Sequence, residues 1–539
     1  MNRNHYATAR AATTLSGLAV LSPLAGLAVE ISLAWRFGAS PTVDAFRIGM
    51  LLLVFGQQLF VIQILPHVVV PVFAEYRARG QEKEAWHVAL SLANLLIVPA
   101  ILFSVFVFFH PEAIVGLLAP GLAGEARETA SVFVRWFVPA AASLLVWSGA
   151  ATGVLYAHRV FWLPPAIQLV GNVAIVLSVL SLGRTLGALS LVIGVLVSAV
   201  MGAMVCLVKL IPLMRQAGAL FPWKLDVTHP GVRKMLTLAL PLLETVLLGQ
   251  WAGIVINRVL SELPPGSLAL FGYAWKLCLV VSVLPLALAT VLFPRFAETH
   301  QSFTGEEFRG MCMRAMRMAL FIVLPLSCLL EALRSSVVAL LFQRGAFSSQ
   351  ASETVAKLFE LLVLSAPAAV ASTYMEKIIY AVQDTWVPTC TQLATALLLT
   401  LFAPVLTVSS GANRLALFYS SLVWLTAGGL ALWLSLRRRA LSLRPLLLFA
   451  VRVLLLALPS AWLAQRAAAF WVSASGSRDF STGLVAAGGL AIGSGVFCGV
   501  FFCVAVGWQI PEAIEWRNYL RWQGSNTVGK LRDFVFGRT

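Results

Sequence analysis

Residues 36–76 read RFGASPTVDAFRIGMLLLVFGQQLFVIQILPHVVVPVFAEY, and this stretch decides the fold. It is apolar enough to cross a bilayer, yet Asp44 and Arg47 lie one helical turn apart near its start. A charge at bilayer depth costs roughly 3 kcal/mol or more unless it faces a partner or a water-filled cavity. At about 100° per residue, Arg47 and Gln58 share one face of the helix. We therefore predict that this helix lines a polar cavity. The alternatives are an ion pair at the helix start and a glutamine that bonds a neighbouring helix.

The composition is that of a membrane protein. Of 539 residues, 59% are hydrophobic and only 12% are charged, and the mean hydropathy is +0.87. Soluble domains carry about 25% charged residues. The net charge of +16 comes from basic residues scattered over short loops, which favours contact with anionic lipid headgroups over nucleic-acid binding. The seven cysteines lie in apolar segments without metal-ligand spacing, so we expect packing residues and no disulfide framework.

Apolar runs of about 20 residues indicate about fourteen membrane spans. Their expected limits are 11–36, 43–75, 85–109, 129–157, 160–182, 187–213, 232–260, 266–297, 313–341, 352–381, 386–408, 412–434, 446–470 and 482–508. With the N-terminus in the cytoplasm, loop lysines and arginines favour that side by roughly three to one, which predicts that both termini are cytoplasmic.

An internal repeat divides the chain. Residues 156–169, YAHRVFWLPPAIQL, match residues 380–393, YAVQDTWVPTCTQL, at an offset of 224, and PVFAE at 71–75 recurs as PRFAE at 294–298. The offset covers an even number of spans, so we expect parallel repeats with the substrate site at their interface. The predicted parts are two six-helix lobes at 1–215 and 216–440, two additional helices at 441–508, and a cytoplasmic interfacial tail at 509–539.

The repeat also pairs two cations. Counting back from the shared P-x-F-A-E sequences, DAFR at 44–47 aligns with YAWK at 273–276, so Arg47 and Lys276 occupy equivalent positions. Lys276 lies about ten residues, roughly 15 Å, inside its span, too deep to reach the headgroups easily. We predict that it lines the cavity; the alternative is a side chain that reaches the outer headgroups. The predicted cavity residues are Arg47, Lys276, Asp44, Gln58 and Glu30.

Further polar residues lie within or at the ends of other spans. Those that are candidates for a gate or an ion site are Glu244, Asn257, Glu376 and Lys377. A carboxylate at Glu244, after Pro241, could bind a proton or a sodium ion, and a hydrogen bond to a neighbouring helix is the alternative. Glu376 and Lys377 lie near the cytoplasmic end of their span, where contact with headgroups is the alternative.

Motifs of catalysis and ATP binding are absent from the sequence. It contains no Walker A loop, GxSxG, HExxH or CxxC. We predict a transporter, not an enzyme, with no cofactor, driven by a sodium or proton gradient, the membrane potential or consumption of the product. The tail after Trp508 alternates aromatic residues with arginines, as interfacial segments on anionic lipid do; recruitment of an envelope-biosynthesis enzyme is the alternative.

Four motifs carry a family resemblance. They are RFGASPTVDAF, the P-x-F-A-E-Y helix end, LLFQRGAFS at 340–348 and Y-x-x-Q-D-T-x-x-P at 380–388. Together they resemble the MurJ/MviN family of lipid II flippases, within the multidrug/oligosaccharidyl-lipid/polysaccharide exporter superfamily. The resemblance implies a protein of the bacterial inner membrane with two six-helix lobes plus two helices. It also implies an undecaprenyl-diphosphate-linked glycan, moved by alternating access through a cationic cavity, and a groove for the lipid tail in the last two helices.

The first helix departs from the family pattern. That pattern typically reads SRxxGxxRD, with two cavity arginines, whereas here Pro23 and Val29 replace them and Glu30 keeps the acid. The family's arginine in the eighth helix is matched by Lys276, a compact charge where a guanidinium would grip a diphosphate bidentately. We therefore expect a divergent member that exports lipid II or another lipid-linked glycan, such as an exopolysaccharide precursor.

Two other functions compete with this prediction. A cation-coupled exporter of drugs or small organic cations, from the same superfamily, would have carboxylates dominating its cavity and usually twelve spans. A membrane scaffold for envelope assembly that no longer transports would tolerate the lost arginines. A net positive cavity favours the flippase, a net negative one the exporter, and a collapsed or apolar one the scaffold.

Overall fold

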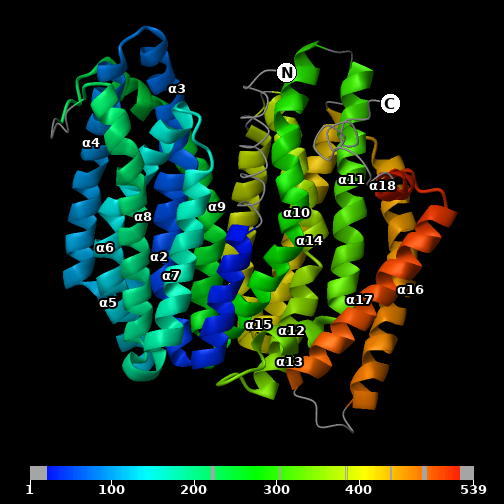
Figure 1. The fold of residues 1–539 in the computed structure, drawn as a ribbon. Helices are drawn as coiled ribbons and strands as arrows, with labels where there is room; N and C mark the ends of the chain where they lie inside the picture. The colour runs from blue at the N-terminus through cyan, green and yellow to red at the C-terminus, as the bar shows by residue number, and fades with distance from the viewer. Residues whose placement is uncertain are drawn as a thin grey trace.

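The computed structural model describes residues 21–219, 225–302, 305–382, 384, 386–437, 440–475 and 482–521. After a helix over residues 21–37, the N-terminal lobe contains α2 (Pro41–Gly56), η1 (Gln57–Ile64), α3 (Leu65–Ala78), α4 (Glu82–Phe109), α5 (Pro111–Leu118), α6 (Gly124–Ala157), α7 (Leu163–Leu186) and α8 (Leu189–Gln216). Figure 1 shows these helices as one bundle beside a second, with α9 between the two.

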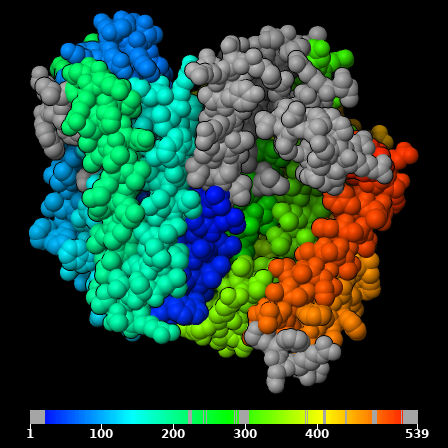
Figure 2. All heavy atoms as spheres, viewed as in Figure 1, coloured from blue at the N-terminus to red at the C-terminus, as the bar shows by residue number. Residues whose placement is uncertain are grey.

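The second bundle is the C-terminal lobe. From α9 onward the helices are α9 (Pro230–Ser261), α10 (Ser267–Ser302), α11 (Gly305–Ala332), α12 (Arg334–Phe342), α13 (Ser349–Val363), α14 (Ala366–Ala381), α15 (Trp386–Leu436), α16 (Leu443–Ser475), α17 (Thr482–Gly507) and α18 (Pro511–Arg521). Figure 2 shows the first helix, in dark blue, lying in the seam between the lobes, with α16 and α17, in orange, on the flank of the C-terminal lobe.

The helices have the length and composition of membrane spans. Eleven described helices are long and apolar enough to cross a bilayer, and α9 adds a twelfth if its two halves, bent by 42° after Leu240, form one span. The two remaining predicted spans coincide with the helix over 21–37 and with α10. The all-helical membrane fold is therefore confirmed, whereas the count of fourteen stays a prediction. Residues 11–20 of the first predicted span lie outside the described residues.

Glycines on α6 let the N-terminal lobe pack closely. A Cβ on Gly149 would meet the backbone carbonyl of Phe60, and one on Gly153 would lie 2.7 Å from the Cβ of Val69. Lipid removes the hydrophobic driving force between helices, so close packing at small residues has to supply the attraction. These glycines therefore hold α6 against η1 and α3.

The larger buried core joins helices of both lobes at one end of the molecule. One cluster contains Phe46 and Phe133 of the N-terminal lobe together with Tyr273 and Phe342 of the C-terminal lobe. A second cluster, around Trp86, belongs to the opposite end of the N-terminal lobe and includes the first half of α9. In the predicted orientation the larger core lies on the outer side, and toward the cytoplasm α9 connects the lobes, since Lys234 forms an ion pair with Glu75 of α3.

The last helix folds back on the C-terminal lobe. Glu512 of α18 forms an ion pair with Arg317 of α11 at 2.9 Å, and the Arg317 guanidinium lies 4.7 Å from the centre of the Phe449 ring on α16. Burial, and then the nearby Glu512 carboxylate, raise the pKa of Glu515 above its ordinary value. The predicted interfacial tail thus begins with a docked helix, and its residues 522–539 lie outside the described part of the chain.

Candidate substrate site between the lobes

Asp44 connects the two lobes. Its carboxylate accepts hydrogen bonds from the backbone N–H groups of Gly266, at 2.5 Å, and Ala269, at 2.7 Å, and the residue is only 3% exposed. These donors belong to the start of α10, where a helix has unpaired N–H groups and a partial positive charge. The aspartate of α2 therefore caps a helix of the opposite lobe. The sequence predicted Asp44 as a cavity residue, with an ion pair at the start of its own helix as the alternative.

Arg47 forms an ion pair with the first helix. Its Nη2 lies 2.7 Å from Oε2 of Glu30, and the two side chains are 16% and 13% exposed. The guanidinium also lies 5.1 Å from the centre of the Tyr273 ring, within the range of a cation–π contact. A Cβ on Gly272 would collide with this guanidinium, so the glycine provides its space. In this state the charge of Arg47 is compensated by Glu30.

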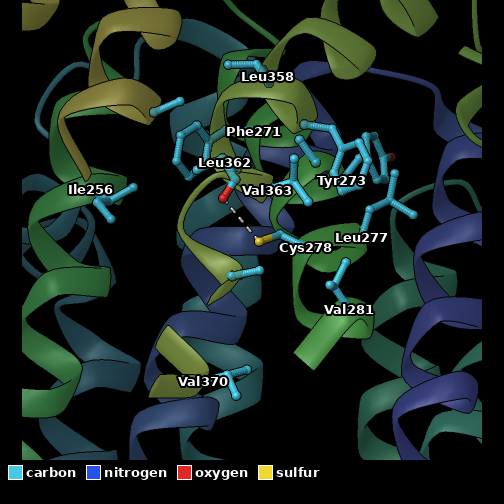
Figure 3. Close-up of a cluster of buried hydrophobic side chains, with 14 of the residues drawn as sticks. Ile256, Phe271, Tyr273, Leu277, Cys278, Val281, Leu358, Leu362, Val363 and Val370 are labelled. Carbon is cyan, nitrogen blue, oxygen red and sulfur yellow. Dashed lines mark hydrogen bonds between the residues drawn. The ribbon is translucent and has the colours of Figure 1, made fainter. Parts of the chain in front are cut away.

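Packing within the C-terminal lobe fixes the register of α10. Figure 3 shows Tyr273, Leu277 and Val281 on this helix, and the Cys278 thiol directed at the Leu362 carbonyl of α13. That sulfur donates a hydrogen bond of 3.3 Å to the carbonyl, and the Tyr273 hydroxyl donates one of 2.9 Å to Gly38 in the N-terminal lobe. All seven cysteines, each within described residues, are free thiols; Cys206, Cys278 and Cys312 are buried as packing residues, whereas Cys390, Cys498 and Cys503 are exposed.

Lys276 reaches back to the first helix. Its Nζ lies 3.0 Å from the point where a Cβ on Gly26 would sit, and Nδ2 of Asn172 lies 3.7 Å from the same point. The lysine is half-buried. Among the described residues, no carboxylate lies within ion-pair distance of it. Both predicted cations therefore lie where the lobes meet, and only Arg47 is paired.

The other predicted site residues lie elsewhere. Glu244 is exposed on α9, near the bend, and Asn257 donates a hydrogen bond of 2.7 Å to Gly253 of its own helix. On α14, Glu376 bonds Gln392 of α15 and interacts with the charge of Lys377. Within the described part of the chain, no group of three or more His, Cys, Asp or Glu is placed to hold a metal ion. A gate or ion site at these residues stays a prediction.

A separate cavity of about 340 Å³ lies inside the N-terminal lobe. We call it the amide cavity, and its polar lining residues are Gln57, Ser148, Tyr156, Gln168, Asn172 and Ser198. Gln58, which the helical spacing favoured, is half-buried and is not one of them. The repeat motif contained Gln168, but neutral residues such as Asn172 and Ser198 gave no signal in the sequence.

Glycines seal the site at the end where the lobes join. Gly38, Gly266 and Gly345 have φ angles of +63°, +90° and +62°, which residues with a Cβ rarely adopt. A Cβ on Gly38 would lie 2.5 Å from the Ala346 carbonyl oxygen, and one on Gly345 would collide with the Trp35 carbonyl. The Ala346 N–H donates a hydrogen bond of 2.9 Å to that Trp35 oxygen. Two motifs quoted above, RFGAS and FQRGAFS, therefore meet backbone to backbone.

Gly345→Ala should open this seal. The new Cβ strains the backbone by about 1–3 kcal/mol and displaces Trp35, which should raise the open fraction by about fivefold or more. A cysteine in place of the fully buried Ala269, with the three exposed cysteines replaced by serine, should then react with a membrane-impermeant maleimide added outside. Gly80→Ala is the matched control, because Gly80 has a φ of +76° but nothing within 4 Å of its Cβ position. Equal labelling of both variants would contradict the assignment.

The fold and the site define a transporter class: two helical lobes closed on one side around cations from each lobe. Residues 33–487 match the family described as lipid II flippase MurJ. The chain belongs to this family, which confirms the predicted resemblance and the prediction of a transporter over an enzyme.

Several curated relatives and solved structures resemble the chain. It is 25% identical over 358 residues to the lipid II flippase MurJ of Burkholderia cenocepacia, covering 65% of this chain and 68% of that protein. It is 27% identical to the probable lipid II flippase MurJ of Rhizobium meliloti, covering 70% and 71%.

Among solved structures, an inward closed conformation of lipid II flippase MurJ has a TM-score of 0.75 at 17% identity, covering 92% of this chain and 98% of that one. An inward-facing multidrug resistance MATE family transporter of the MOP superfamily has a TM-score of 0.64 at 15% identity, covering 78% and 95%. At these identities the two structures support the fold alone.

Proposed function

We propose that this protein translocates a polyprenyl-diphosphate-linked glycan, lipid II or a related envelope precursor, across the bacterial inner membrane by alternating access. The observation that carries the proposal is Lys276, which lies at the lobe interface beside the Arg47–Glu30 pair and has no ion-pair partner in the described part of the chain. A diphosphate needs cations that both lobes can bring to it. Membership of a family named for lipid II flippases supports the same substrate class.

The ion pair suggests how the substrate is sensed. Lys276 meets the diphosphate first, because it has no carboxylate partner among the described residues. The diphosphate then competes with Glu30 for Arg47, whose guanidinium can bind two oxygens at once. Loss of the Arg47–Glu30 pair frees the first helix from α2 and loosens the contacts that hold the outer side closed. Substrate binding is thereby coupled to the change of access.

The pairing of charges at the interface favours an anionic substrate over a cation. Asp44 is bound by backbone N–H groups, and Glu30 is bound by Arg47. The formal charges of Arg47, Lys276, Asp44 and Glu30 sum to zero, but within the described residues Lys276 is the one of the four that has neither an ion-pair partner nor a set of backbone N–H donors. An exporter of organic cations would need an uncompensated carboxylate in its place, and a scaffold would not need the cations at all.

The negative charge of the proposed substrate suggests an energy source. We propose that the membrane potential drives export, because an inside-negative membrane favours outward movement of an anion by about 2.3 kcal/mol per charge at 100 mV. A sodium or proton gradient is the alternative. Both termini are proposed to be cytoplasmic, with α18 on the membrane surface, where anionic lipid or an envelope-biosynthesis enzyme would be the partner.

Combined loss of both cations should stop export. Cells depleted of the protein should expose lipid-linked precursor on the outer leaflet when rescued with wild type, but not with Arg47→Ala plus Lys276→Ala. The double variant should reduce exposure at least 100-fold, since each lost charged hydrogen bond costs about 1.5–3 kcal/mol. Arg135→Ala is the control, because Arg135 is exposed on α6 and should keep activity.

The identity of the affected precursor separates the remaining functions. Accumulation of peptidoglycan precursor inside the cell would identify lipid II as the substrate. Loss of a capsule or exopolysaccharide with normal peptidoglycan would assign the protein to another lipid-linked glycan. If depletion left every lipid-linked precursor normally exposed, the transport proposal would be wrong.

A further inference from the structure

The amide cavity lies next to the cation that meets the substrate. Asn172 lines the cavity, and its Nδ2 and Lys276 Nζ face the same point beside Gly26, at 3.7 and 3.0 Å from it. Gln168 and Asn172 also contact Ser22 of the first helix, with hydrogen bonds of 3.1 and 3.5 Å. A substrate group that extends from a diphosphate at Lys276 toward the N-terminal lobe therefore reaches the wall of this cavity.

The lining of the cavity does not suit a phosphate. Of the described residues that line it, none carries a charge, and the polar ones are two glutamines, an asparagine, two serines and a tyrosine. Amide side chains offer one acceptor and two donors each, and hydroxyls offer both roles. This set matches the hydroxyl and acetamido groups of an N-acetylated sugar, which also need neutral donors and acceptors.

The size and shape of the cavity agree with a small neutral group. A volume of about 340 Å³ lies at the lower end of the range for small-molecule sites, about 300–1,000 Å³, and suits one or two sugar rings. Its wall includes Gln57, Val61 and Ile62 of the π-helix η1, and π-helical turns occur frequently at functional sites.

We propose that the amide cavity binds the first sugar of the transported headgroup, an N-acetylated hexosamine, while the diphosphate stays at Lys276. This inference rests on the proposed function, since it assumes a sugar bonded directly to a diphosphate. It divides recognition between two places: Lys276 binds the charge that every such lipid carries, and the neutral cavity distinguishes lipids that carry the sugar.

The test compares two lipids on the full-length protein in nanodiscs. The probes are undecaprenyl diphosphate and undecaprenyl-diphosphate-N-acetylglucosamine. Gln168→Leu with Asn172→Leu should weaken binding of the sugar lipid by about tenfold or more, the loss expected for two neutral hydrogen bonds, and leave undecaprenyl diphosphate unchanged. Lys276→Ala should weaken both lipids. Gln57→Leu, on a different wall, gives an independent second variant with the same selective loss.

Two controls separate recognition from packing. Gln63→Leu changes an exposed glutamine of the same π-helix that does not line the cavity, and Ser22→Ala removes the partner of Gln168 without changing the lining; both should bind the two lipids as wild type does. Equal loss of both lipids in the cavity variants, or loss of neither, would overturn the sugar site. Wild type that binds neither lipid would overturn the proposed function, and the sugar site with it.

Discussion

Asp44→Ala should reduce transport to the level of cells that lack the protein. The substitution leaves the N–H groups of Gly266 and Ala269 without their acceptor at a site where Asp44 is 3% exposed, so water cannot easily replace it. Two buried donors without a partner cost roughly 3 kcal/mol together, which corresponds to about a 100-fold change in an equilibrium. The contact between α2 and α10 should therefore open, and α10 carries Lys276.

The measurement combines transport with accessibility. Precursor exposure should be lost in Asp44→Ala, and a cysteine in place of Ala269 should become reactive from outside. Asp44→Asn is the graded control, because its amide oxygen can still accept one of the two N–H groups, so it should lose less activity than alanine. Wild-type transport by the alanine variant would show that this contact does not hold the lobes together.

Charge reversal at Arg47 should have a comparable effect. Arg47→Glu places a second carboxylate against Glu30 and beside the Ala269 carbonyl, which now lies 3.4 Å from Arg47 Nη2. Like charges in a partly buried site repel by several kcal/mol. Transport should be abolished, whereas Arg135→Glu, at an exposed position, should have little effect. Precursor exposure and protein level, measured together, separate lost function from lost folding.

The exchanged pair distinguishes the two roles of Arg47. Glu30→Arg combined with Arg47→Glu restores the ion pair with its two charges exchanged between the helices. The protein level should therefore recover from that of the Arg47→Glu variant. Transport should stay low, because the cation has then moved from α2 to the first helix and no longer faces α10. Full transport by the exchanged pair would mean that Arg47 serves only to pair with Glu30, and that Lys276 alone binds the diphosphate.

The free-energy cost of placing charges in a bilayer explains why the general position of the candidate site could be predicted from the sequence. Charges such as Arg47 and Lys276 are expensive at bilayer depth, so their presence within apolar spans predicted a polar surface. The matched motifs in the two halves then placed both residues at the lobe interface. The fold was more predictable still, because about 20 consecutive apolar residues admit few structures other than a membrane helix.

The partners were harder to predict than the positions. Asp44 binds backbone N–H groups on α10, and every residue except proline has such a group, so no side-chain pattern identifies the partner. The amide cavity is built from neutral residues whose presence in a membrane span is ordinary. Residues 57–64 also form a π-helix, for which their composition gave no signal.

The glycine contacts between the lobes bear on inhibition and resistance. A compound lodged between residues 38–39 and 345–346 would touch several peptide groups, which remain chemically the same under almost any substitution, together with the Trp35 side chain. Escape at Gly38, Gly266 or Gly345 is restricted, because their positive φ angles exclude most replacements. A resistance substitution at one of these glycines should also impair closure of the lobes. Resistance should therefore arise less easily on this surface than in the substrate cavity.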